Sequence, residues 1–268
     1  MFKVYFVTIT IIVLFAVNLF LVFQNSRDST TLVVFIDDYI DDNQQAFILP
    51  ISGPNYIPIL DSSIVEPLVS AKSAIVYDTK SGRFLFEKNS DLKMPIASLT
   101  KVMTAVIVLE KMNLDAIVAI KEDSVRVDEE KQDLYLGEKI SVRNLLKLML
   151  IESSNDAAYA LVSHAKINGT DFINEMNLKA QSLGMFNSNF IDSAGLNDNA
   201  HSSVQDLIKL VEYSLKYQEI WDISAEKTAI IESSDEKIKH TARSTNLLIG
   251  LIKDFIGGKT GYTEGAGQ

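Results

Sequence analysis

Apolar residues form one long run at the start of the chain and shorter periodic patterns after it. Residues 4–23 are mostly apolar, with Asn18 as the main polar interruption, and Lys3 precedes them. Roughly twenty residues at a helical rise of about 1.5 Å each cover about 30 Å, the thickness of the hydrocarbon core of a bilayer. We therefore interpret residues 1–24 as a signal-anchor that spans the cell membrane once, with a cytoplasmic amino end and an exported body. A cleaved signal peptide, which would release a secreted or periplasmic protein, is the alternative.

Residues 25–69 show no sustained apolar period. They contain acidic pairs at 37–38 and 41–42. They also contain prolines at Pro50, Pro54, Pro58 and Pro67. Because proline lacks a backbone N–H and restricts the residue before it, such a segment disfavours both a helix and a central strand. We predict a linker or stalk that leads to a folded domain beginning at residue 70.

Strand-like patterns open this folded domain. Residues 73–78 and 83–87 are two such runs, and the connection between them ends in Gly82, which adopts positive φ without strain. This pattern predicts an antiparallel hairpin. Residues 115–140 are mixed and charged, and they predict short strands and loops.

Apolar residues at helical spacing dominate the middle of the chain. They predict a helix from near Ser98 to about Met112. Further helices are predicted after Ser141, after residues 152–155, after Thr170 or Asp171, and after Ser203. Strands and helices thus mix without the alternation of a parallel sheet. This predicts an α+β fold, with an antiparallel sheet flanked by helices and an all-helical subregion.

Composition argues against several classes of function. The chain of 268 residues carries a formal net charge of -10 and no cysteine. A nucleic-acid-binding protein needs a basic face for the phosphates, so nucleic acid is not an expected partner. Without cysteine there is no disulfide framework, thiolate zinc site or cysteine nucleophile. His164, His201 and His240 form no i,i+4 pair, and the sequence predicts neither a metal site nor a cofactor.

Ser98 and Lys101 are the first candidates for chemistry. At positions i and i+3 they share one face of the predicted helix, and an apolar run follows them. A serine at the start of a helix lies among unpaired backbone N–H groups at the positive end of the helix dipole. A nucleophile with its base one helical turn away suits serine chemistry.

The same short patterns recur elsewhere, so only their context separates them. The S-x-x-K pattern recurs at Ser224 and Lys227 and at Ser234 and Lys237. The S-x-N pattern occurs twice, at Ser153 and Asn155 and at Ser244 and Asn246. A K-T-G triplet is formed by Lys259, Thr260 and Gly261, and residues 80–82 resemble it. Ser98 alone precedes a strongly apolar helix. Ser153 lies on a tight connection between two apolar helices. The glycines before Lys259 let a substrate backbone approach closely. Helix capping or surface exposure is the alternative for each of these side chains.

The motifs at Ser98, Ser153 and Lys259 follow one another in the order found in the penicillin-recognising serine enzymes. From about Ser73 to Gln268 the chain resembles the D-alanyl-D-alanine carboxypeptidases, the low-molecular-mass penicillin-binding proteins. The resemblance includes the stretches at residues 96–101, 154–158, 192–196, 201–203 and 258–263. It implies the β-lactamase/transpeptidase-like fold for residues 70–268.

The resemblance implies a hydrolase of peptidoglycan biosynthesis that acts on stem peptides ending in D-Ala-D-Ala. Ser98 would attack the carbonyl of the penultimate D-alanine, and Lys101, in its neutral form, would be the general base. Ser153 would relay a proton to the leaving amine. β-Lactams would acylate Ser98 as inhibitors.

Substrate binding is also assigned by the resemblance. Asn155 would hold the base and a substrate amide, while Lys259 and Thr260 would bind the terminal carboxylate. The oxyanion hole would use the backbone N–H of Ser98 and of Tyr262, the residue after Gly261. No residue is assigned to a metal.

Other functions stay open. A D,D-endopeptidase that cuts peptide cross-links fits the same residues. A β-lactamase would need a carboxylate to activate the deacylating water, and Glu175, the acidic residue considered for this role, falls inside a helical run. A membrane-anchored, non-catalytic wall-binding protein is disfavoured because all the reactive residues are present.

Few residues follow the K-T-G triplet, since the sequence ends at Gln268. Members of the family continue here into further strands and a helix of the same domain. The resemblance therefore implies that residues 70–268 are a C-terminally incomplete domain without the last strands of its sheet. An incomplete sheet exposes an unpaired edge.

Overall fold

The computed structural model describes residues 57–61, 63–125, 127 and 133–267, which lie in a compact unit from Asn55 to Gln268. The predicted signal-anchor at residues 1–24 and most of the predicted linker lie outside the described residues. In the part of the chain that the structure describes, no helix has the length and apolar character needed to cross a membrane. The boundaries of these two segments stay predictions.

The first element is the hairpin that the strand-like runs predict. β1 (Ala74–Asp78) pairs with β2 (Arg83–Lys88) in antiparallel register. The Gly82 amide donates to Asp78 O at 2.9 Å to close the turn, and Gly82 has a φ of +67°. This left-handed backbone favours glycine, which is why the turn forms at this position. The predicted hairpin is confirmed.

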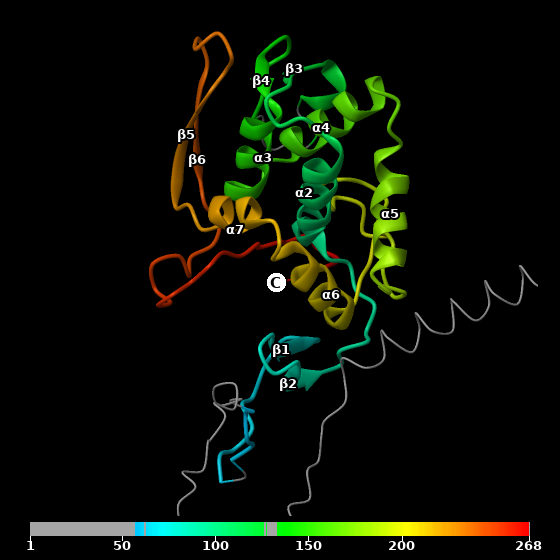
Figure 1. Cartoon of the computed structure of the whole chain (residues 1–268), viewed down its shortest axis with the longest axis vertical. Coiled ribbons are helices and arrows are strands. Elements are labelled where there is room, and N and C mark those ends of the chain that lie inside the picture. Colours follow the sequence, from blue (N-terminus) through cyan, green and yellow to red (C-terminus); the bar gives the residue numbers. More distant parts are fainter. Residues whose placement is uncertain (1–56, 62, 126, 128–132, 268) are drawn as a thin grey trace, which may run out of the picture. The chain divides into compact units, whose positions relative to one another are not determined.

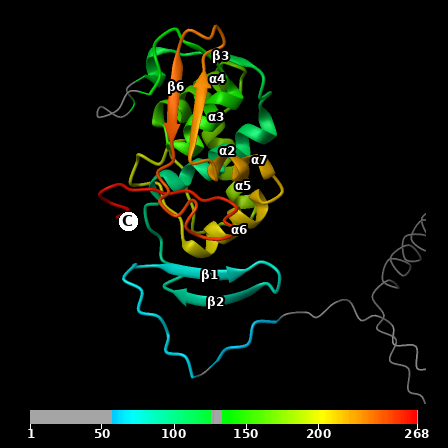
Figure 2. The same ribbon diagram turned by 90° about the vertical axis from the view of Figure 1, so that its left-hand side faces the viewer.

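Two further hairpins account for the remaining strands of the described residues. β3 (Ile117–Ala119) pairs with β4 (Lys139–Ser141), and β5 (Thr228–Glu232) pairs with β6 (Lys239–Arg243), both antiparallel. The three hairpins are separate two-stranded sheets. β1 lies against α6, and β5 and β6 lie against α3, so each hairpin packs on the helices (Figures 1 and 2).

The α+β class is confirmed, but the described residues do not form the one antiparallel sheet that the sequence predicts. Within the described residues the segment around Lys259 belongs to no strand, and a single bridge between Thr263 and Gly267 follows it. A hairpin pairs residues that are close in the chain, whereas merging hairpins into one sheet requires pairing between distant segments. The local patterns predict the first kind of contact and carry no information on the second.

The described residues also form six α-helices, and α2 lies at their centre (Figure 1). They are α2 (Thr100–Lys111), α3 (Val142–Ile151), α4 (Asn155–Ile167), α5 (Phe172–Ser182), α6 (Val204–Ser214) and α7 (Gln218–Ser224). α2 contacts every one of the other five. Short 3-10 helices occupy Ala97–Leu99 and Glu122–Ser124.

Side-chain caps fix the starts of four of these helices. Ser141, Ser154, Asp171 and Ser203 each accept a hydrogen bond from the backbone N–H three residues further on. A cap of this kind stabilises a helix by about 0.5–2 kcal/mol. The predicted helix starts at Ser141, Asp171 and Ser203 are confirmed. On the connection between α3 and α4 the cap is Ser154, so the side chain of Ser153 points elsewhere.

The core is built mainly from α2 and α3. Side chains that are 0% exposed include Met103, Val106, Ile107, Leu145, Leu146 and Met149. Because α2 is buried for most of its length, its amino end is held firmly by the surrounding helices. This end carries Ser98 and Lys101.

We predict that Leu146→Ala lowers the free energy of unfolding by about 2–5 kcal/mol, because the substitution leaves a cavity in the fully buried centre of the core. Leu178→Ala is the matched control, since Leu178 is 50% exposed on α5, and its cost is below about 1 kcal/mol. Denaturant unfolding of both variants measures the difference. Equal costs would contradict this description of the core.

Candidate active site

Ser98 lies in the 3-10 turn Ala97–Leu99, immediately before α2. Ala97 has a φ of +46°, in the left-handed region that costs an alanine about 1–2 kcal/mol. The turn is in direct contact with the backbone of Gly195, because a Cβ added to Gly195 would meet Ala97 O at 1.8 Å. The surrounding fold therefore imposes the conformation that presents Ser98.

Lys101 faces inward from the first turn of α2, and its side chain is fully buried. Its Nζ lies 2.8 Å from Ser98 Oγ, 2.7 Å from Asn155 Oδ1 and 2.9 Å from Ala194 O. The amide and carbonyl oxygens only accept hydrogen bonds, so a neutral amine that keeps these two contacts turns its lone pair toward the Ser98 hydroxyl. Lys101 is thus in position to take the proton of Ser98.

One carboxylate shapes the loop that brings Ala194 to Lys101. Asp192 Oδ1 accepts hydrogen bonds from the backbone amides of Ala194 and Gly195, at 2.7 and 2.5 Å. Several backbone donors on a single carboxylate hold a loop in one conformation. Asp192 therefore positions the carbonyl that accepts from Lys101, although its own side chain has no contact with the reactive groups in the described interactions.

Ser153 connects α3 to α4 and has a φ of +66°, a second left-handed backbone position beside the site. Its hydroxyl accepts a hydrogen bond from Lys259 Nζ at 2.8 Å. Lys259 also donates to Thr260 O at 2.7 Å. Lys259 therefore links the K-T-G triplet to the S-x-N motif through Ser153, in the same way that Lys101 is hydrogen-bonded to Ser98 in the S-x-x-K motif.

Burial lowers the pKa of Lys259 from its ordinary value of 10.5 to about 8, because the charged amine loses solvation. At neutral pH the group is still mostly protonated. It is nevertheless close enough to its pKa to give up and regain a proton readily, which suits a proton relay through Ser153.

Gly261 packs against the turn that holds Ser98. A Cβ at this position would lie 2.9 Å from Ser98 N and 3.3 Å from Ile96 O. The absence of a side chain lets the segment after Lys259 run directly beside the Ser98 amide. Tyr262, the next residue, is 64% exposed at the mouth of the site.

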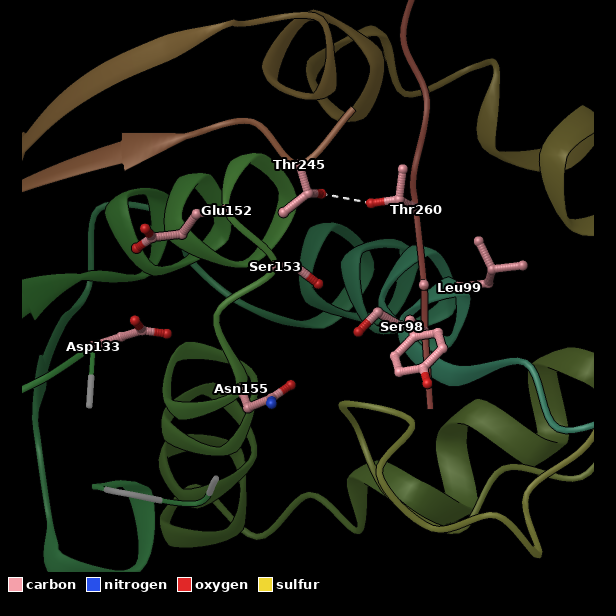
Figure 3. A pocket seen from close by; sticks show the side chains of 10 residues that line it. Ser98, Leu99, Asp133, Glu152, Ser153, Asn155, Thr245 and Thr260 are labelled. Atoms are coloured by element: carbon pink, nitrogen blue, oxygen red, sulfur yellow. Dashed lines mark hydrogen bonds between the residues drawn. The ribbon is translucent and has the colours of Figure 1, made fainter. Parts of the chain in front are cut away.

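These groups line a cavity of about 700 Å³. Its walls are Ser98, Leu99, Asp133, Glu152, Ser153, Asn155, Thr245, Thr260, Gly261 and Tyr262. Figure 3 shows Ser98, Ser153 and Asn155 around its centre, with Thr245 and Thr260 joined at one side and Asp133 and Glu152 at the other. A cavity of this size accommodates a short peptide end.

The structure brings all the predicted site residues into this one region. Six of them line the cavity, and Lys101 and Lys259 lie behind it, bonded to Ser98 and Ser153. The roles assigned to them stay predictions. The grouping itself depends on segments far apart in the sequence, which motif order indicated without giving any distance.

The serines of the competing S-x-x-K patterns do not line the cavity. Ser224 is buried at the end of α7, where its hydroxyl donates to Trp221 O at 3.1 Å. Ser234 lies between β5 and β6, and its amide bonds to the carbonyl of Lys139. Glu175, considered as a β-lactamase carboxylate, pairs on α5 with Lys111 at 3.0 Å.

Sequence reasoning missed three polar side chains of the cavity. Asp133 and Glu152 form part of its wall, and Thr245 Oγ1 lies 2.5 Å from Thr260 Oγ1. Thr245 falls inside the second S-x-N pattern, between Ser244 and Asn246. No local pattern in the sequence indicates Thr245, because its nearness to the K-T-G triplet is a contact in space.

The comparisons with known proteins agree with this geometry. A family model described as D-alanyl-D-alanine carboxypeptidase matches residues 61–268. The chain is 39% identical over 208 residues to a D-alanyl-D-alanine endopeptidase of Haemophilus influenzae, covering 76% of this chain and 70% of that protein. It is 32% identical over 201 residues to the D-alanyl-D-alanine carboxypeptidase DacF of Bacillus subtilis, covering 72% of this chain and 51% of that protein. The matched part of the chain thus spans 70% of the first relative's length and about half of the second's.

Solved structures show the same fold. A Streptomyces DD-transpeptidase variant superposes with a TM-score of 0.68 at 30% identity, covering 75% of this chain and 84% of that one. A D-alanyl-D-alanine carboxypeptidase from Mycobacterium tuberculosis gives a TM-score of 0.69 at 26% identity, covering 78% and 79%. The penicillin-binding, DD-peptidase fold implied by the sequence is confirmed for the described residues.

We predict that Gly195→Ala destabilises the protein more than Gly137→Ala. Both glycines have φ near +80°, so left-handed alanine costs each variant about 1–2 kcal/mol. At Gly137 no atom lies within 4 Å of the added Cβ, whereas at Gly195 the Cβ collides with the carbonyl of Ala97, which adds roughly 1–3 kcal/mol. Denaturant unfolding compares the two. Equal losses would show that the contact with the Ser98 turn is not tight.

Proposed function

Because the chain belongs to the D-alanyl-D-alanine carboxypeptidase family, we propose that it is a serine peptidase that removes the terminal D-alanine from peptidoglycan stem peptides. The observation that carries the proposal is the contact between Lys101 Nζ and Ser98 Oγ at 2.8 Å beside the N–H of Ser98 and the Gly261 segment. The proposed reaction needs a base, a nucleophile and an oxyanion donor around one point, and this contact supports it.

In the first step Ser98 Oγ bonds to the carbonyl carbon of the penultimate D-alanine, while Lys101 takes the hydroxyl proton. The carbonyl oxygen gains negative charge as the tetrahedral intermediate forms. The backbone N–H groups of Ser98 and Tyr262 are the donors that stabilise this charge. The Ser98 amide belongs to a closely packed turn, so it needs little reorganisation during the reaction.

Collapse of the intermediate breaks the peptide bond, and the leaving amine needs a proton. Ser153 is the group to deliver it, since its hydroxyl is bonded to Lys259 at 2.8 Å and is replenished from there. Terminal D-alanine leaves, and an ester remains on Ser98. Lys101 passes the proton that it took from Ser98 to the relay that Lys259 has emptied, and so becomes neutral again. It then deprotonates a water molecule that attacks the ester carbonyl, and the proton goes to Ser98 Oγ as the acyl product leaves.

The substrate carboxylate is drawn to the side of the cavity that holds Thr260, where the charge of Lys259 favours an anion. Asn155 lies opposite, and its Oδ1 accepts a hydrogen bond from Lys101 at 2.7 Å. In this proposal its amide N–H₂ donates to a substrate amide carbonyl. β-Lactams carry an acyl group and a carboxylate at a similar spacing, so they enter the same site and acylate Ser98.

A D,D-endopeptidase is the second candidate function. Curated relatives from Haemophilus influenzae and Escherichia coli, 39% and 33% identical, bear that name. The same acylation chemistry cuts a cross-link when the leaving amine belongs to a second stem peptide. The two activities differ only in which leaving group the open side of the cavity admits.

We also propose that residues 4–23 hold the domain at the outer face of the cell membrane. The support is the length of the apolar run and the lysine before it. Stem peptides lie on that side of the membrane, so the location agrees with the proposed substrate.

We predict that Ser98→Ala abolishes labelling by a fluorescent penicillin and release of D-alanine from a pentapeptide ending in D-Ala-D-Ala, because the acyl acceptor is removed. Gel fluorescence and mass spectrometry measure the two signals. Ser224→Ala and Ser234→Ala, which alter the competing S-x-x-K patterns, retain both signals. Labelling of Ser98→Ala at the wild-type level would remove the central assignment.

We predict that the charge of Lys259 determines how kcat/KM changes with pH on the alkaline side. The charge of Lys259 is present below its pKa of about 8 and is lost above it, so kcat/KM for a peptide with a free carboxylate falls as the pH rises through about 8. In Lys259→Arg the charge persists, because arginine stays protonated, and this limb moves to higher pH. An unchanged limb in the arginine variant would assign it to another group.

A further inference from the structure

Thr245 is a cavity residue to which the mechanism assigns no role. It follows β6 and lies beside the K-T-G segment, and its Oγ1 is 2.5 Å from Thr260 Oγ1. We propose that Thr245 and Thr260 form a two-hydroxyl binding site for the terminal carboxylate, and that Thr245 determines the preference for substrates with a free carboxylate. The inference rests on the proposed function, since it takes that substrate as given.

The hydroxyl pair has a donor to spare. Each threonine has one O–H, and a single hydrogen bond between the two oxygens uses only one of these hydrogens. The other hydrogen is free to point into the cavity. When an anion arrives, both hydroxyls can rotate and donate to the two oxygens of one carboxylate, a charge-assisted arrangement stronger than the bond between neutral hydroxyls.

The two hydroxyls also lie where the carboxylate is expected once the scissile carbonyl is next to Ser98. Gly261 runs beside the Ser98 amide, so the scissile carbonyl lies next to Gly261. The carboxylate of the leaving D-alanine is one residue further on, and one extended residue covers about 3.3–3.6 Å. Thr260 is likewise one residue away from Gly261, so the carboxylate falls beside Thr260. Figure 3 shows Thr245 and Thr260 together at the side of the cavity above Ser98.

The fold holds Thr245 in place from both sides. The amide of Ser244 donates to Lys227 O at 2.9 Å, and the amide of Asn246 donates to Ser244 Oγ at 3.1 Å. On the facing segment, a Cβ at Gly258 would meet Asn246 Nδ2 at 2.8 Å. The Thr245 loop is therefore packed closely against the residue before Lys259, which fixes the hydroxyl before substrate arrives.

The contacts of Lys259 indicate that its charge and the two threonine hydroxyls act on the carboxylate in different ways. Its Nζ donates to Ser153 Oγ and to Thr260 O, so these donors are directed at the proton relay and at its own backbone. The lysine supplies a positive field, while direct hydrogen bonds to the carboxylate come from the two hydroxyls. Among the cavity-lining residues, Thr245 is the one that adds the second hydroxyl on this side.

The test measures binding without catalysis. In a Ser98→Ala background, isothermal titration calorimetry compares a tripeptide ending in D-Ala-D-Ala as the free acid with the same peptide as the carboxamide. Loss of one hydrogen bond to a charged group weakens binding by about 10- to 100-fold. Thr245→Val is therefore expected to raise the Kd of the acid by this factor and to leave the Kd of the amide unchanged.

Matched variants separate the hydroxyl from the fold. Thr245→Ser keeps the O–H and retains the preference for the acid, and Thr241→Val, on the exposed side of β6, changes neither Kd. If Thr245→Val weakens acid and amide equally, or neither, the carboxylate assignment is wrong. If the parent Ser98→Ala protein itself shows no preference for the acid, it is equally overturned. Absence of D-alanine release by the wild-type protein, with the acid preference intact, would refute the proposed function and leave this site standing.

Discussion

The burial of the Lys101 amino group is the constraint on which the rest of the site depends. A fully buried amine needs acceptors, because each unsatisfied N–H would cost about 1–3 kcal/mol in a region without water. Its hydrogen-bond partners lie in the adjacent turn before α2 and in two distant segments, the start of α4 and the loop at Ala194. Satisfying one side chain therefore brings three segments together, and their meeting point is the reactive serine.

The segment that carries Lys259 is held in a different way. In the described residues it has no strand partner, and side-chain contacts position it instead. Lys259 bonds to Ser153, Thr260 bonds to Thr245, and Thr263 bonds to Asp198 at 2.8 Å. One wall of the cavity is thus rigid helix, and the facing wall depends on a few hydroxyl, amine and carboxylate contacts that are easier to alter by substitution.

Local patterns in the sequence predicted the local structure. The first hairpin and three helix starts could be predicted from the sequence, because each depends on one residue that acts on its own backbone or on the next turn. These residues are Gly82, Ser141, Asp171 and Ser203. The order of the motifs predicted which residues meet. Thr245 and the separation of the hairpins were not predictable, because both depend on distances between segments remote in the chain, and no single window of sequence contains those distances.

The left-handed backbone of Ala97 and Ser153 restricts which substitutions such a site can accept during evolution. Each conformation costs of the order of 1–3 kcal/mol, and the packed helices supply the energy that maintains it. Replacing Ala97 by glycine would relieve the strain and also loosen the turn that presents the nucleophile. Thermodynamic stability and catalytic geometry thus oppose each other at these two peptide units, so substitutions that raise the melting temperature here tend to be selected against for activity.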